Sequence, residues 1–262
     1  MGILNVTPDS FYDGGHYSDL DSQASRLEQM ISQGVELIDI GGYSTRPGAD
    51  NPSITEEIKR TLPAIRKAKE LAPDLPVSID TFRSEVAKAA LEAGADMVND
   101  ISGGSLDPNM YQLVADFQVP YVLMHTKGTP QTMSGMTDYQ DLLTDILKDL
   151  SGKLQLLTQH GVNDVIVDPG FGFAKNLDQN YLLLKELPLF EALGVPIMVG
   201  LSRKSMIYKA LGVTAEDSLD GTNVLNTIAL MHGASILRVH DVKSAKEAVY
   251  LYTKTFSSES HD

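Results

Sequence analysis

The chain contains no cysteine and no tryptophan, and only 6% of its residues are aromatic. The missing cysteine excludes disulfide bonds, a thiolate metal site and a cysteine nucleophile, and it makes a reducing cytoplasm the expected location. Long apolar runs are missing too, since the longest comprises only residues 248–252. Crossing a bilayer takes ~20 apolar residues and a signal-peptide core roughly 7–15, so we expect no association with a membrane.

Positive charge is scarce as well. The sequence has 21 Lys and Arg against 35 Asp and Glu, a formal net charge of −14. A nucleic-acid-binding protein needs a basic face to neutralise phosphates, and this composition excludes that class. Hydrophobic residues make up 42% and charged residues 21%, which is typical of a globular protein. Barrels of about 250 residues are commonly single domains, so we treat residues 1–262 as one domain.

Short apolar runs rich in Ile, Val and Leu alternate with stretches of helical spacing along the whole chain. The runs occupy residues 2–7, 36–42, 77–81, 97–103, 121–125, 165–170, 197–202 and 236–241. The clearest helical stripe lies within residues 139–160, and Gly161 follows it as a stop signal. Eight such units without a linker predict a single-domain (β/α)8 TIM barrel. A doubly wound open sheet is the alternative architecture.

Local signals agree with this pattern. Ser53 and Glu56 have the spacing of a capping box, while Gly34 and Gly94 stand where helices are expected to end. Met1 falls inside or just before the first apolar run. We therefore also expect that a native N-terminal segment before the first strand is missing, a segment that would close the bottom of the barrel.

Polar residues gather at the carboxyl ends of the apolar runs. They are Asn5, Asp39, Asp80, Asn99, His125, Asp168, Ser202, Arg238 and His240. Any one of them is explained equally well as a strand or loop cap. In a barrel, however, the ends of all eight strands meet at one mouth, where the active site lies. Taken together, these residues predict that site.

One subset combines carboxylates with an amide. Asp80, Asn99 and Asp168 end three different runs and supply hydrogen-bond acceptors plus one group that also donates. This inventory favours recognition of a ring that carries several N–H groups. General acid–base catalysis or a divalent metal site is the alternative use of two facing carboxylates.

A second subset is basic and comprises Arg46, Arg203, Lys204, Arg238 and His240. Cations gathered at one mouth of such an acidic chain predict an anionic ligand, with phosphate the usual one. The turn at residues 202–205 is expected to open a helix whose free N–H groups would also hold an anion. As an alternative, Arg203 and Lys204 are ordinary solvated residues of a first helical turn, where cations are unfavourable.

The segments 8–19 and 44–53 are long for loops that follow barrel strands, and both contain Gly and Pro. Long loops at a barrel mouth are commonly lids, although tolerated insertions would look the same. Phe173, in the segment after the sixth run, is expected near the mouth as a platform for a ring or as a half-buried packing residue.

The sequence resembles a known enzyme family over essentially its whole length. The matching motifs are MGILNVTPDSF, GGYSTRPGA, SIDT, NDISGG, LMHTKGTPQTM, DPGFGF, GLSRKSMI and RVHDV. In order and spacing they resemble the bacterial dihydropteroate synthases, the sulfonamide targets of folate synthesis. The resemblance implies condensation of 6-hydroxymethyl-7,8-dihydropterin pyrophosphate with 4-aminobenzoate. It further implies Mg²⁺ as cofactor and a homodimer.

Site residues follow from the resemblance position by position. The pterin contacts it implies are Asp80, Asn99, Asp168 and Lys204, with Met124 beside the ring. The pyrophosphate contacts are Asn5, Arg46, Arg238 and His240, and Asn5 is also the implied Mg²⁺ ligand. The surroundings of 4-aminobenzoate and of sulfonamide inhibitors are Phe11, Thr45, Pro47, Phe173, Lys204 and Ser205.

The implied chemistry needs no protein nucleophile. We expect a dissociative, SN1-like path in which Asp80, Asp168, Lys204 and Arg238 are catalytic because they stabilise the separating charges. Two rivals remain at this point. A pterin-binding methyltransferase domain that serves a corrinoid shares the pterin residues but has no use for the anion-binding set. A barrel that binds pterin without catalysis would not need that set either.

Overall fold

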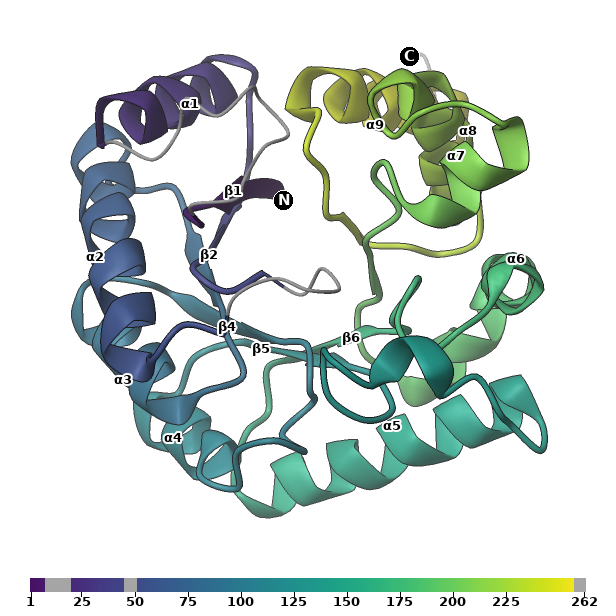
Figure 1. Ribbon diagram of the computed structural model, residues 1–262, viewed down its shortest axis with the longest axis horizontal. Helices are drawn as coiled ribbons and strands as arrows, with labels where there is room; N and C mark the ends of the chain where they lie inside the picture. Colours follow the sequence, from purple (N-terminus) through teal and green to yellow (C-terminus); the bar gives the residue numbers. More distant parts are fainter. Residues whose placement is uncertain (8–19, 45–50, 257–262) are drawn as a thin grey trace, which may run out of the picture.

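The computed structural model describes residues 1–7, 20–44 and 51–256. Within these residues, short parallel strands alternate with helices and lie inside a ring of helices (Figure 1). The strands are β1 (Gly2–Asn5), β2 (Ile38–Gly41), β3 (Val77–Asp80), β4 (Met97–Asp100), β5 (Tyr121–Met124), β6 (Val165–Asp168), β7 (Met198–Val199) and β8 (Ile236–Leu237). Each falls inside one of the eight apolar runs.

The strands form a continuous ring. Strands β1 to β6 pair in parallel in chain order, and β7 pairs in parallel with β8. Two isolated parallel bridges join these sheets, one between Val167 and Ile197 and the other between Gly2 and Val239. The second is reinforced where Ile3 N donates to Val239 O at 2.9 Å. The predicted (β/α)8 barrel is therefore confirmed, and the doubly wound open sheet is excluded because it would have two free edges.

Helices cover the outside of the barrel. They are α1 (Leu20–Ser32), α2 (Ile54–Leu71), α3 (Ser84–Glu92), α4 (Met110–Phe117), α5 (Leu142–Gln159), α6 (Leu177–Lys185), α7 (Ser205–Leu211), α8 (Leu219–Met231) and α9 (Val242–Phe256), with short 3-10 helices at Met133–Gly135, Leu187–Leu193 and Glu216–Ser218. In the described part of the chain, no helix is both long and apolar enough to cross a membrane.

Local sequence signals fix where two of these helices begin and end. The Ser53 side chain accepts a hydrogen bond from Glu56 N and caps α2, as its spacing predicted. Helix α5 coincides with the stripe expected within residues 139–160, and it buries Ile146, Leu150 and Leu157 against the barrel. After it the chain reverses at Gly161, whose φ of +83° is a conformation that glycine adopts without strain.

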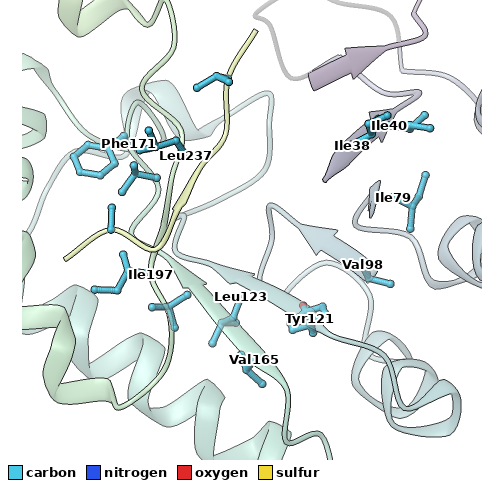
Figure 2. Close-up of a cluster of buried hydrophobic side chains, with 14 of the residues drawn as sticks. Ile38, Ile40, Ile79, Val98, Tyr121, Leu123, Val165, Phe171, Ile197 and Leu237 are labelled. Atoms are coloured by element: carbon cyan, nitrogen blue, oxygen red, sulfur yellow. The ribbon is translucent and has the colours of Figure 1, made fainter. Parts of the chain in front are cut away.

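Two apolar layers hold the barrel together. Outward-facing strand residues such as Ile38, Val98 and Leu123 pack against the helices, and Figure 2 shows them along successive strands. A smaller cluster of buried residues fills the barrel interior. It comprises Met97, Val122, Ile166 and Met198, with the partly buried Met1, Leu37 and Ile236 packed against it.

Candidate active site

Strand alternation places the polar residues above the interior apolar layer. Moving two positions along a strand keeps a side chain on the same face. Starting from the interior cluster, that step leads to Asp39, Asn99, Met124, Asp168 and Arg238. These side chains therefore form the next layer toward the carboxyl ends of the strands, where a barrel carries its active site.

An ion-pair network joins four strands in this layer. Arg238 Nε lies 2.6 Å from Asp39 Oδ2, and Arg238 Nη2 lies 2.6 Å from Asp80 Oδ2. Asn99 Nδ2 also donates to Asp39 Oδ2, at 2.9 Å. Within the described residues, Arg238 Nη1 has no hydrogen-bond partner. The guanidinium is thus held along one edge and keeps one nitrogen for a ligand.

Burial and charge oppose each other in this network. Burial lowers the pKa of Arg238, but the carboxylates of Asp39 and Asp80 outweigh it and hold the pKa above its ordinary value. Burial raises the pKa of Asp80, while the neighbouring guanidinium opposes that rise. The Asp39 side chain is fully buried, whereas that of Asp80 is 18% exposed. Asp80 is therefore the carboxylate that a ligand in the mouth reaches.

Asp39 is a site residue whose role the sequence did not reveal. In sequence it is only a polar residue at a strand end, yet in the structure it is the partner of both Arg238 and Asn99. Its Oδ1 is buried and has no hydrogen-bond partner in the described part of the chain. The signal was present in the alternation of Leu37, Asp39 and Gly41 along the second apolar run, because that alternation aims the carboxylate at the barrel axis.

Asp168 and Lys204 form a second wall of the site, beside the network around Arg238. Asp168 Oδ1 accepts from Gly170 N at 2.7 Å, so the carboxylate is fixed by the turn that follows its own strand. Lys204 Nζ donates to the Phe171 carbonyl and lies 4.6 Å from the centre of the Phe173 ring. This contact confirms the expectation that Phe173 lies near the mouth.

Asp168 and Lys204 each stabilise the charged form of the other. Burial raises the pKa of Asp168, and the ammonium of Lys204 opposes the rise most strongly. Burial lowers the pKa of Lys204 to about 8, while Asp168 works in the other direction. Lys204 is therefore a cation near neutral pH that loses its proton under mildly alkaline conditions.

Two residues of the predicted basic subset, Arg203 and His240, do not present a positive charge to a ligand in the mouth. Arg203 forms a bidentate ion pair with Asp241, with Nε to Oδ2 at 2.7 Å and Nη2 to Oδ1 at 2.9 Å. Its Nη1 donates to the carbonyls of Ala215 and Glu216. The prediction that Arg203 belongs to the anion site was wrong, because its guanidinium ties together the loops after β7 and β8.

His240 differs from the expected basic residue in its charge. Its Nδ1 lies 3.1 Å from Ser202 Oγ, and burial together with the charge of Arg238 lowers its pKa to about 3. The imidazole is therefore neutral at physiological pH and offers hydrogen bonds rather than charge. Helix α7 begins at Ser205, as expected for the turn at residues 202–205. Phe11, Thr45, Arg46 and Pro47 lie outside the described residues.

Asn5 ends β1 and pairs in register with Gly41, which pairs in turn with Asp80. Its half-buried amide therefore stands at the level of the polar layer. Among the described residues, no group of three or more His, Asp or Glu side chains could enclose a metal ion. One amide oxygen nevertheless fits Mg²⁺, which prefers oxygen ligands and is commonly held by one or two protein groups plus substrate phosphates.

Comparison with known proteins agrees with this geometry. The family described as pterin binding enzyme matches residues 1–240. A dihydropteroate synthase from Synechocystis is 46% identical over 247 residues, which cover 93% of this chain and 85% of that protein. The structure of the Yersinia pestis dihydropteroate synthase with a sulfonamide drug complex superposes on this one with a TM-score of 0.94 at 40% sequence identity. The superposition covers 98% of this chain and 94% of the Yersinia pestis chain.

The Xanthomonas albilineans dihydropteroate synthase with 4-aminobenzoic acid gives a TM-score of 0.91 at 37% identity, over 98% of this chain and 92% of that one. The fold and the family match thus define the class, a pterin-binding enzyme built on an α/β barrel. Within that class, the chain belongs to the dihydropteroate synthase family. The family expected from the motifs is confirmed.

Proposed function

We propose that this protein condenses 6-hydroxymethyl-7,8-dihydropterin pyrophosphate with 4-aminobenzoate to give 7,8-dihydropteroate and pyrophosphate. The observation that carries the proposal is that Asp80, Asn99 and Asp168 lie at the carboxyl ends of β3, β4 and β6, with Lys204 close to Asp168. Two carboxylates, an amide and an ammonium match the alternating donors and acceptors of a pterin ring. Met124, on the strand between Asn99 and Asp168, packs beside that ring.

The bond changes balance without a protein nucleophile. The bond between the pterin methylene carbon and the pyrophosphate oxygen breaks, and its electron pair leaves with pyrophosphate. The lone pair of the arylamine then forms the C–N bond, and the amine proton passes to pyrophosphate or water. An electron-rich dihydropterin can share the transient positive charge across its ring, which supports an SN1-like order of events.

The protein stabilises the two separating charges. Asp80 on β3 and Asp168 on β6 favour a cationic ring, while Lys204 donates to the ring with Asp168 offsetting its charge. Arg238 Nη1 is available for an oxygen of the departing anion, and His240 adds a neutral hydrogen bond. Arg46 would complete this set.

Asn5 would hold Mg²⁺ together with substrate oxygens. When bound, the ion neutralises charge on the leaving pyrophosphate. Phe11, Thr45, Pro47, Phe173 and Ser205 would surround 4-aminobenzoate, with Ser205 meeting its carboxylate at the start of α7. Sulfonamides copy the ring and the anionic end of this substrate, so we propose that they inhibit the protein at the same place.

We also propose a homodimer that works in the cytoplasm. Large apolar side chains on the last helices are more than half exposed, a supporting feature because exposed apolar patches commonly mark protein contacts. They include Leu211, Val224, Met231, Tyr250 and Leu251. The absence of cysteine is compatible with the reducing cytoplasm. Sedimentation of the purified protein tests the dimer.

A turnover assay with purified protein tests the activity. It follows pyrophosphate release and identifies the pterin product by mass, with either substrate or Mg²⁺ omitted in turn. We expect 7,8-dihydropteroate only when both substrates are present, and slower pyrophosphate release without Mg²⁺. Binding of the pterin without any release would instead favour the non-catalytic barrel.

A further inference from the structure

A buried lysine, Lys175, binds the turn at residues 169–174. The same turn fixes the Asp168 carboxylate and accepts a hydrogen bond from Lys204. Lys175 is 7% exposed, and its Nζ has three polar neighbours. It donates to the Gly170 carbonyl at 2.9 Å and the Phe173 carbonyl at 3.0 Å, and it lies 3.1 Å from His125 Nδ1. These three contacts match the three N–H donors of an ammonium group.

The turn is closely packed on both sides, and two of its glycines leave little room for a side chain. Gly170 has a φ of +76°, and a Cβ there would stand 2.0 Å from the His125 carbonyl oxygen. Gly172 has a φ of +78°, and its Cβ would stand 3.2 Å from Lys204 Cδ. The turn is thus pressed against the end of β5 on one side and against Lys204 on the other.

The two lysines bind different carbonyls of this turn. Lys175 binds the carbonyls of Gly170 and Phe173, while Lys204 binds that of Phe171 between them. Fixing the carbonyls of Gly170 and Phe173 restricts the directions in which the Phe171 carbonyl between them can point. Lys204 then receives its carbonyl partner and its Phe173 contact from a turn whose shape Lys175 sets.

We propose that Lys175, anchored by His125, is a positioning residue that fixes the pterin-binding wall formed by Lys204, Asp168 and the turn between β6 and α6. This inference rests on the proposed function and deepens it. Without Lys175 the turn would lose two carbonyl contacts at once. Lys204 would then be free to leave the Phe171 carbonyl and pair directly with Asp168.

His125 is built as an anchor rather than as an acid or base. It is 2% exposed, and its backbone N donates to the Asp168 carbonyl at 2.9 Å, which ties β5 to β6. Burial lowers its pKa to about 2, so the imidazole stays neutral. When Lys175 is charged it has no lone pair, and His125 Nδ1 is then the acceptor of their hydrogen bond.

Calorimetric titration of the full chain with two separate probes tests the proposal. One probe is 6-hydroxymethyl-7,8-dihydropterin, and the other is inorganic pyrophosphate with Mg²⁺. In Lys175→Met we expect pterin affinity to fall at least tenfold, which is ~1.4 kcal/mol, while pyrophosphate affinity stays within twofold. Loss of overall structure would lower both affinities together. Lys69→Met is the matched control, because Lys69 Nζ also donates to two backbone carbonyls, those of Pro73 and Leu75, but at the amino-terminal end of β3, away from the mouth. Both of its affinities should stay within twofold.

A second pair of variants decides the matter even if Lys175→Met fails to fold. Asparagine places an amide oxygen or nitrogen close to the position of His125 Nδ1, whereas leucine fills similar space without a polar atom. His125→Asn should therefore retain pterin affinity, and His125→Leu should lose it by about the same factor as Lys175→Met. Equal pterin affinity in these two variants, or an unchanged affinity in Lys175→Met, overturns the proposal. Failure of the unmodified protein to bind the pterin overturns the proposed function, and this inference with it.

Discussion

Arg238 is held by two carboxylates that differ in burial, and this difference predicts two separate consequences of removing them. Asp39 is fully buried and binds both Arg238 and Asn99, whereas Asp80 is 18% exposed and binds Arg238 alone. Replacing Asp39 by alanine deprives Arg238 of its buried partner and leaves the amide of Asn99 without its acceptor. Replacing Asp80 leaves Arg238 paired with Asp39.

The expected magnitudes follow from these contacts. Removing one partner of a buried ion pair costs about 3–5 kcal/mol of unfolding free energy, and we expect this range for Asp39→Ala. Loss of a single hydrogen bond to a charged group costs about 1.5–3 kcal/mol, and Asp80→Ala should fall there. Asp80→Ala should therefore remain folded at room temperature yet lose turnover, because it removes the carboxylate that a bound pterin reaches.

Urea denaturation of both variants, with turnover measured on the same preparations, checks these expectations. Equal losses of unfolding free energy would refute the assignment of Asp39 as the structural carboxylate and Asp80 as the accessible one. Asp168→Ala serves as a parallel case and should also abolish turnover without unfolding the chain. Near-normal activity in either folded variant, Asp80→Ala or Asp168→Ala, would contradict the pterin site itself.

Three further predictions concern pH and binding. Because the pKa of Lys204 is lowered to about 8, kcat/KM should decline as the pH rises above that value, and a pH–rate profile of Lys204→Arg should lack this decline. In calorimetry, 4-aminobenzoate should bind well only after pyrophosphate and Mg²⁺ are added; equal affinity with and without them would contradict ordered binding. Pro47→Ser or Phe11→Leu should raise the inhibition constant of a sulfonamide about tenfold more than the Michaelis constant for the aminobenzoate substrate, equivalent to ~1.4 kcal/mol. Lys204→Ala should instead weaken drug and substrate alike, and equal losses in the loop variants would mean that those loops do not border the drug.

The barrel could be predicted from sequence because its elements are encoded locally. Eight apolar runs mark the strands, and signals such as Ser53 and Gly161 mark where helices begin or stop. The last two strands are shorter than their runs suggested, at Met198–Val199 and Ile236–Leu237. Closure of the ring there depends on isolated bridges, which no local pattern specifies.

The candidate site residues could also be selected from the sequence. Asp80, Asn99 and Asp168 end parallel strands, and in a barrel such ends meet at one mouth whatever the details of packing. Their chemistry could therefore be inferred before their positions were known. The motifs that resemble dihydropteroate synthases then narrowed this chemistry to a pterin.

Partnerships between distant side chains were decided only by the tertiary structure. Arg203 and His240 are basic in sequence, yet Arg203 is bound by Asp241 and His240 is kept neutral by burial beside Arg238. The roles of Asp39 and Lys175 depend on contacts with residues up to 199 positions away. Charge, hydration and hydrogen-bond partners are properties of the surroundings of a side chain, and those surroundings exist only once the eight strands have closed into a ring.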